Sequence, residues 1–301
     1  MPDGQLPPVP RNRNFGEPSD FAKQDEVLVA LEWSHAFTEN WTLRHRFNAD
    51  FLDINDLGTF SSFNLFNPED LGLDPAILAG LDPNRTLLRF RQEFVSHGEL
   101  YYNTLDLTGK LETWGLDHTL LLGGDYLYEP TDGGSPGFSI LPPTDLFNPT
   151  HGDAPILTSG DFFGNDTAEK WHGFYVQDQV QLPYNLHLLA GFRYDHASID
   201  RTAPGFEVSA TEERVTPRYA LLWRPRSELS FYGSYTEGFA GTTLGRITRS
   251  FDNIGAETAE QWELGAKTEL FDGHLTGSVA YFQLTKDNIA VTDPSDFPLF
   301  R

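Results

Sequence analysis

The sequence predicts an all-β fold: a transmembrane antiparallel β-barrel of the outer-membrane type, with about ten strands in this chain. Three observations predict it. Apolar and polar residues alternate with a period of two in one segment after another. The connections between these segments alternate between short and long. No stretch of the sequence reaches the ~18 consecutive apolar residues that a membrane-spanning helix requires.

The composition limits the classes of function that remain. The chain has 301 residues, 39% of them hydrophobic, and its 44 acidic and 21 basic residues give a formal net charge of −23. Such a charge repels nucleic-acid phosphates, so no nucleic-acid partner is expected. The absence of cysteine excludes disulfides and Cys-ligated metal centres. The mean hydropathy of −0.39 fits strands that are polar on one face.

The first predicted hairpin shows the alternation clearly. Apolar residues occupy odd positions from Val27 to Trp33, with Glu26, Glu32 and Ser34 among the even positions. After a break at 38–40, the alternation resumes from Trp41 to Phe51, with charged and amide residues on the opposite face. Two such strands and a tight turn predict a β-hairpin.

The later strands repeat this pattern and are joined by two kinds of connection. Asp272-Gly273 is the strongest turn signal, because Asp-Gly suits the hairpin turns that match strand twist. Because periplasmic turns of outer-membrane barrels are short and extracellular loops long, the short turns are predicted to face the periplasm. The predicted short turns lie near Glu39, Trp114, Tyr184, Arg226 and Asp272. The predicted long loops cover residues 57–86, 131–169, 201–212 and 240–256.

A soluble β-sandwich or propeller also has alternating strands, and any single strand here fits that alternative. The alternation of connection lengths favours the barrel, and so do aromatic residues near strand ends, because membrane barrels carry aromatic girdles at both interfaces. Those aromatic residues are Trp33, Trp41, Trp114, Trp223, Tyr128 and Tyr235.

No motif for catalysis or metal binding stands out. The nine histidines lack the spacing of metal sites, and no pair of carboxylates is set apart as an acid and a base. A G-x-S-x-G elbow and a phosphate-binding loop are absent. Asp132-Gly133-Gly134 has the residue types of a calcium loop but is more typical of a turn. We therefore predict a protein that is not an enzyme.

Seven segments carry a likeness to a known family. The most specific is WHGFYVQDQVQLPYNLHLLAGFRYDH (171–196), in which YVQDQ is followed by a GxRYD strand. The others are GEPSD (16–20), LDHTLLLGGDY (116–126), TPRYALLWRP (216–225), FYGSYTEGF (231–239), AETAEQWELGAKTELFDG (256–273) and AYFQLTKDNI (280–289). In this order they resemble TonB-dependent siderophore receptors of the ferrichrome-receptor type.

The resemblance implies a barrel of roughly 22 strands around an N-terminal plug domain. It implies that a ferric siderophore, of hydroxamate type, binds on the extracellular side, and that the TonB–ExbB–ExbD complex supplies energy through the plug. The implied location is the outer membrane of a Gram-negative cell, where outer-membrane lipid surrounds the barrel. Because the siderophore itself holds the iron, no cofactor and no metal ligand are expected from the chain.

The resemblance also implies that aromatic residues of the extracellular loops and upper barrel wall contact the siderophore. Phe147 in LFNPT and Phe239 in YTEGF occupy positions that are similar to such aromatics. Tyr126 and Tyr128 are predicted near the same rim. The alternative is that these rings only pack on one another.

The sequence shows no recognisable plug, TonB box or signal peptide, and fewer than half of the family's strands. We therefore expect residues 1–301 to form a partial barrel domain, with 1–24 as an extracellular loop, from a receptor fragment or a degenerate gene. Two other functions remain open: a passive porin-like channel, and a soluble carbohydrate-binding β protein.

Overall fold

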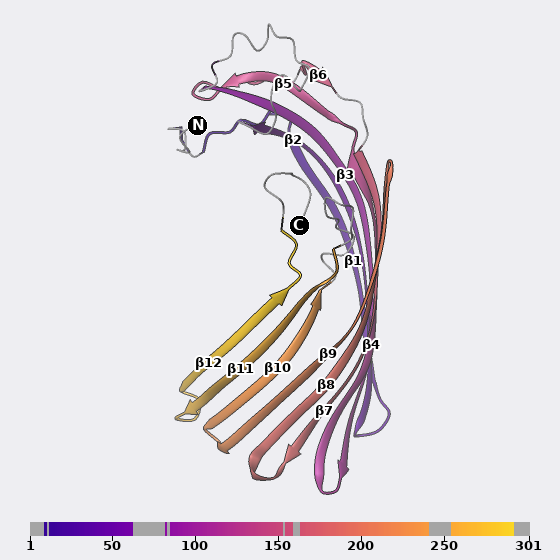
Figure 1. Cartoon of the computed structure of the whole chain (residues 1–301), viewed down its shortest axis with the longest axis vertical. Coiled ribbons are helices and arrows are strands. Elements are labelled where there is room, and N and C mark those ends of the chain that lie inside the picture. The colour runs from indigo at the N-terminus through magenta and orange to yellow at the C-terminus, as the bar shows by residue number, and fades with distance from the viewer. Residues whose placement is uncertain are drawn as a thin grey trace.

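The computed structural model describes residues 9–10, 12–62, 82, 85–152, 154–158, 163–240 and 254–291. They form one strongly curved antiparallel sheet of 12 strands (Figure 1). Within these residues, no helix combines the length and the apolar character needed to cross a membrane. The predicted all-β class is confirmed.

Ten strands lie side by side in chain order, as the sequence predicts. They are β1 (Phe21–Ala36), β2 (Trp41–Ser62), β3 (Thr86–Thr113), β4 (Leu116–Ser135), β7 (Phe163–Leu182), β8 (Leu186–Ala203), β9 (Phe206–Arg226), β10 (Leu229–Ala240), β11 (Glu257–Leu270) and β12 (Leu275–Asp287). Two further strands lie off this path: β5 (Phe138–Asp145) pairs with β3, and β6 (Leu157–Thr158) pairs with β5.

The period of two gives the sheet two unlike faces. Asp106, Tyr175 and Arg193 line a hollow that is shared by seven neighbouring strands, so they mark the concave face of the curve in Figure 1. The opposite face, here called the outer face, carries exposed apolar side chains such as Leu122 and Phe174. A continuous exposed apolar band is what contact with lipid requires.

The predicted short turns are confirmed at one end of the sheet, here called the turn end; the opposite end is called the loop end. Trp114 and Gly115 have φ angles of 52° and 76°, and Tyr184 and Asn185 have φ angles of 66° and 57°. Two successive residues with positive φ match the twist of antiparallel strands. The turn predicted at 225–227 lies slightly later, because β9 ends at Arg226 and β10 begins at Leu229.

Gly115→Ala is expected to lower the free energy of unfolding by about 1 kcal/mol, because an L residue is strained at positive φ. Urea unfolding of the protein in detergent micelles measures this. Gly152→Ala is the matched control: an added Cβ meets no atom within 4 Å at either glycine, but only Gly115 has a positive φ. Equal losses in the two variants would show that backbone strain is not the cause.

At the loop end the strands run further than the sequence predicts. The predicted loop over 201–212 is wrong, because β8 and β9 continue to a two-residue connection, Pro204-Gly205. Gly205 has a φ of 75°, which suits this tight turn. The predicted alternation of short and long connections therefore fails at this hairpin. Both strands extend past the ~9–11 residues that cross a membrane, so residues predicted as a loop belong to the strands.

The predicted loop over 131–169 is also largely wrong. β4 continues to Ser135, so Asp132-Gly133-Gly134 lies in a strand and not in a turn. Pro136 and Gly137, the latter with a φ of 123°, then interrupt the strand, and β5 takes over the pairing with β3. The other two predicted loops, 57–86 and 240–256, fall mostly outside the described residues, although β2 continues to Ser62.

The two edge strands of the sheet are β1 and β12. Within the described residues each of them pairs on one side only, and they do not pair with each other. The sheet is therefore an open arc of barrel wall. β1 begins at Phe21, inside the segment 1–24 that was predicted as an extracellular loop.

Candidate functional site

A belt of charged and aromatic side chains crosses the concave face in the membrane-spanning part of the wall. Arg193 lies at its centre. Its two Nη atoms donate to Asp125 at 2.7 and 2.9 Å, and its Nε donates to Asp195 at 2.8 Å. The guanidinium also lies 5.4 Å from the centre of the Tyr175 ring. Asp125 and Asp195 are both nearly buried, and the Arg193 guanidinium compensates the negative charges of both carboxylates.

The belt continues across β3 and β2. The Tyr175 hydroxyl donates to Asp106, and Arg46 donates to the second oxygen of Asp106 at 2.8 Å. Hydrogen bonds and the contact of the Arg193 guanidinium with the Tyr175 ring thus connect five neighbouring strands across the sheet. We call this set the luminal belt; its members are Arg46, Asp106, Asp125, Tyr175, Arg193 and Asp195.

The two most family-like segments of the sequence build the luminal belt. The period of two in YVQDQ directs Tyr175 to the concave face, and the same period in GFRYD directs Arg193 and Asp195 there. Gly173 lies beneath the guanidinium, where an added Cβ would be 2.0 Å from an Arg193 Nη. The belt therefore depends on a glycine as well as on its charges.

Asp178 of YVQDQ faces the other way, on the otherwise apolar outer face. It is not isolated there, because its Oδ2 lies 2.7 Å from His118 Nδ1. The second ring nitrogen of His118 lies 2.9 Å from the Thr113 hydroxyl. This chain of contacts reduces the cost of a carboxylate on a lipid-facing wall.

Exposed aromatic rings mark a hollow on the concave face near the loop end, between β1, β2 and β3. Phe60 and Phe94 are 61% and 44% exposed, and the hollow that they line has a volume of about 640 Å³. Asp56 pairs directly with Phe94, and Gly58 pairs with Gln92, so these side chains share the face of Asp106. We call this the aromatic hollow. Exposed rings in a concave wall are typical of ligand-binding surfaces.

Sequence reasoning missed the aromatic hollow because 57–86 was read as a loop. The sequence carries no clear signal there, because Asp56, Gly58 and Phe60 share one face but do not keep a polar or an apolar character. Phe94 lies in the strand that the sequence did predict. The residues that lie beside Phe94 on β2 could not be predicted without the register between β2 and β3.

Phe239 lies on the concave side, in an aromatic cluster. Its ring centre is 5.3 Å from that of Trp171, and both rings pack on the buried side chains Ala197, Ile199 and Ala210. The pairing of β10 with β9 ends at Thr236, so the last residues of β10 leave β9 and contact the concave face of its neighbours.

Phe147 lies beyond β5 at the loop end, with 39% of its surface exposed. The Arg85 guanidinium carbon is 5.3 Å from the centre of its ring, and Arg85 also pairs with Asp145 at 2.7 Å. The backbone N–H of Phe147, which donates to Asp145, lowers the pKa of that carboxyl, and so do the N–H of Asn148 and the charge of Arg85.

Tyr126 and Tyr128 lie on the outer face, away from the aromatic hollow. The Tyr126 ring stacks on His172 at 5.5 Å between centres, and the Tyr128 ring stacks on Tyr101 at 6.3 Å. Lys170 Nζ lies 5.8 Å from the centre of the Tyr128 ring. These stacked rings lie about a membrane's thickness from the turn end, where outer-membrane barrels carry an aromatic girdle at the membrane interface. A role of these two tyrosines in ligand binding stays a prediction.

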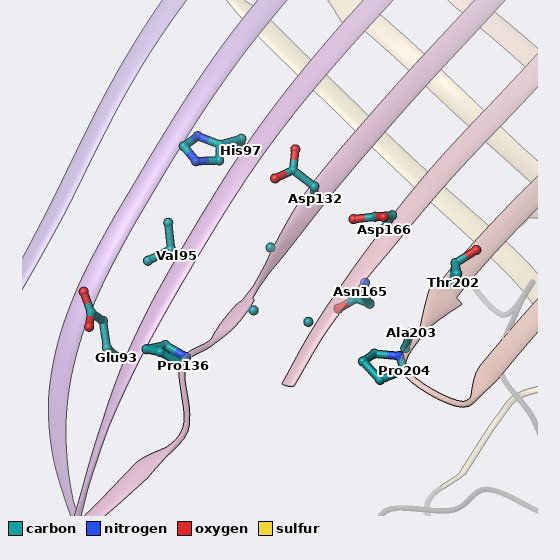
Figure 2. Close-up of a pocket in the computed structure, with 13 residues that line it drawn as sticks. Glu93, Val95, His97, Asp132, Pro136, Asn165, Asp166, Thr202, Ala203 and Pro204 are labelled. Carbon is teal, nitrogen blue, oxygen red and sulfur yellow. The ribbon is translucent and has the colours of Figure 1, made fainter. Parts of the chain in front are cut away.

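A second hollow opens on the outer face at the loop end, and Figure 2 shows its side chains. It has a volume of about 570 Å³, and Asp132 and Asp166 face each other across β4 and β7 within it. His97 lies beside them, and a hydrogen bond to Asp53 raises the pKa of the imidazole. No group of three potential metal ligands occurs among the residues that the structure describes.

An apolar outer face, short turns at one end and a charged concave wall define a segment of an outer-membrane β-barrel. The chain belongs to the family described as "TonB dependent receptor-like, beta-barrel", which matches residues 2–300. The protein is therefore one of the outer membrane.

Two relatives illustrate the similarity. The chain is 28% identical to the metal-pseudopaline receptor of Pseudomonas aeruginosa, over 98% of this chain and 41% of that protein. It is 27% identical to the ferrichrome outer membrane transporter/phage receptor of Escherichia coli, over 98% of this chain and 40% of that protein. The chain thus spans about two fifths of the length of these relatives.

Solved structures agree on the fold. The closed form of the ferric-catecholate import receptor Fiu of Escherichia coli has a TM-score of 0.75 at 14% identity, over 94% of this chain and 43% of that one. The ferripyoverdine receptor of Pseudomonas aeruginosa, bound to ferripyoverdine, has a TM-score of 0.75 at 19% identity. The match covers 99% of this chain and 39% of that one.

Proposed function

We propose that the chain forms part of the ligand-binding barrel wall of a receptor that takes up ferric siderophores across the outer membrane. The relatives support this, since their names specify ferrichrome, ferrioxamine B and pyoverdine. In this proposal the TonB–ExbB–ExbD complex supplies the energy through a plug domain, and outer-membrane lipid surrounds the wall. The function is transport, without a covalent step.

The observation that carries the proposal is the aromatic hollow. Exposed phenylalanine rings on the concave wall are unfavourably hydrated, so a partner that covers them gains free energy, and a siderophore chelate offers apolar and planar surface. Phe60 and Phe94 lie beyond the ~9–11 residues of β2 and β3 next to the turn end that cross the membrane. A ligand arriving from outside therefore meets them first.

In the proposal the siderophore holds the iron and the chain supplies no metal ligand or cofactor. The wall contacts the organic shell of the chelate through Phe60 and Phe94, through Phe147 at the loop end, and through the ring of Phe239. Tyr126 and Tyr128 are less suited to this contact, because their rings stack on outer-face neighbours.

Phe60→Ala and Phe94→Ala are each expected to weaken binding of a ferric siderophore roughly tenfold, since a lost aromatic contact is worth about 1.4 kcal/mol. Quenching of tryptophan fluorescence measures this, with the protein in detergent and ferrichrome or ferrioxamine B as the titrant. Phe51→Ala is the matched control, because Phe51 lies on β2 but its ring packs on outer-face Tyr101.

Two outcomes would count against the proposal. Equal affinities of the Phe60, Phe94 and Phe51 variants would remove the aromatic hollow as the site. A protein that binds neither chelate but conducts ions after reconstitution would favour a passive porin-like channel. Phe147→Ala and Phe239→Ala belong to the same series, and unchanged affinity in both would remove these two residues from the site.

A further inference from the structure

A buried ion pair lies at the loop end of the wall. Arg89 and Glu17 are 1% and 5% exposed, and Arg89 Nη1 donates to Glu17 Oε1. Arg89 also donates from Nε and Nη2 to the carbonyl oxygen of Pro142 in β5, at 3.1 and 2.9 Å. One guanidinium therefore joins the N-terminal segment, β3 and β5.

Glu17 makes a third connection. Both of its carboxylate oxygens accept from the backbone N–H of Gly152, at 3.1 and 3.0 Å. The GEPSD segment around it is itself anchored, because Asp20 accepts from Glu17 N at 2.8 Å and from the Thr59 hydroxyl at 2.7 Å. GEPSD is thus a family-like segment whose Glu17 joins the ion pair and whose Asp20 also lines the aromatic hollow.

The largest buried side chains lie in the same place. The largest fully buried side chains of the described residues all lie here: Arg89, Leu87, Ile140, Leu141, Leu146 and Thr144. This buried packing, together with the pairing of β5 with β3, indicates that β5 and residues 146–152 are held in one position. We call β5 with these residues, 138–152, the strap.

The strap carries Phe147, and hydrogen bonds hold the chain on both sides of it. Arg13 Nη1 donates to the carbonyl oxygens of Leu146, at 3.4 Å, and Phe147. Asp145 accepts from the N–H of Phe147 at 2.7 Å. Beyond Phe147, the N–H of Thr150 donates to the Thr144 hydroxyl at 2.8 Å. The exposed ring and the Arg85 guanidinium above it are thus presented on a fixed support.

We propose that Glu17 and Arg89 are positioning residues: they lock the strap onto β3 and so fix Phe147 for contact with the ligand. The inference rests on the proposed function, in which Phe147 is a ligand contact. A buried ion pair is a weak source of net stability, but removing one partner leaves a buried charge without compensation. The pair therefore specifies one position of the strap, because other positions leave Glu17 or Arg89 unpaired.

The test compares Arg89→Met with the double variant Glu17→Leu/Arg89→Met in the full chain in detergent. Hydrogen exchange of residues 138–152, without ligand, reports whether the strap is held. Arg89→Met is expected to accelerate this exchange at least about tenfold, since local opening frees these amides. The double variant, which removes both charges, is expected to restore slow exchange. Lys23→Met, which breaks the exposed Lys23–Asp25 pair nearby, is the control and should change nothing.

Titration with ferrichrome and ferrioxamine B then tests the positioning role. Arg89→Met is expected to weaken binding as much as Phe147→Ala does, the two changes together no further, and the double variant is expected to regain affinity. Unchanged exchange in Arg89→Met overturns the inference whether or not a chelate binds. Faster exchange with unchanged affinity, or additive losses with Phe147→Ala, also overturns it. Wild-type protein that binds neither chelate overturns the proposed function instead, while the exchange data still show whether the pair holds the strap.

Discussion

Replacing Arg193 with methionine is expected to lower the free energy of unfolding by about 3 kcal/mol, the lower end of the cost of breaking a buried ion pair. The lower end applies because the Arg193 side chain is one-third exposed to the lumen. Methionine keeps most of the apolar contact but leaves Asp125 and Asp195, both nearly buried, without their shared cation. Urea unfolding in detergent micelles, followed by tryptophan fluorescence, measures the loss.

The control for this prediction is Arg44→Met. Arg44 pairs with Glu32 at 3.6 Å, and both side chains are more than half exposed, so the change should cost less than about 0.5 kcal/mol. Adding Asp125→Asn to Arg193→Met should recover part of the loss, because it removes one unpaired charge. A loss below about 1 kcal/mol for Arg193→Met would show that water in the lumen compensates the carboxylates and that the belt is not a stabilising element.

Gly173→Ala is expected to destabilise the wall by about 2 kcal/mol, within the usual range for overpacking. The new Cβ would lie 2.0 Å from one Arg193 Nη and 2.7 Å from Asp125 Oδ1. A free arginine would move away cheaply, but this one is held by Asp125 and Asp195. Displacing it breaks hydrogen bonds to charged groups, which are among the stronger ones in proteins. The same unfolding experiment measures the effect.

Gly277→Ala is the matched glycine control. It also lies in a strand, but its added Cβ would be 3.4 Å from Thr268 Cγ2, an ordinary contact, so little change is expected. Combining Gly173→Ala with Arg193→Met separates the causes. If the alanine costs stability only by displacing Arg193, it should cost little once Arg193 is gone. An equal cost in both backgrounds would place the strain in the backbone of β7.

The sequence predicted the hairpins of the membrane-spanning wall because their determinants are local. Lipid on one side and water on the other impose a period of two, and positive φ at Trp114-Gly115 or near Asp272-Gly273 belongs to the turn residues themselves. β5 could not be predicted in this way. Pro142 and Pro143 argue against a strand, since each lacks a backbone N–H. In the structure the register with β3 shifts between Leu87 and Arg89, beside these prolines, and so accommodates them.

The sequence by itself determined the fold class, the ten-strand path and the face on which Tyr175, Arg193 and Asp195 lie, because alternation in a strand needs no knowledge of its neighbours. Only the tertiary structure decided which residues meet. Arg89 and Glu17 are separated by 72 positions, and Phe60 and Phe94 come together through the register of two strands that a long connection joins. Contacts of this kind depend on pairing across the sheet, which no local pattern in one strand encodes.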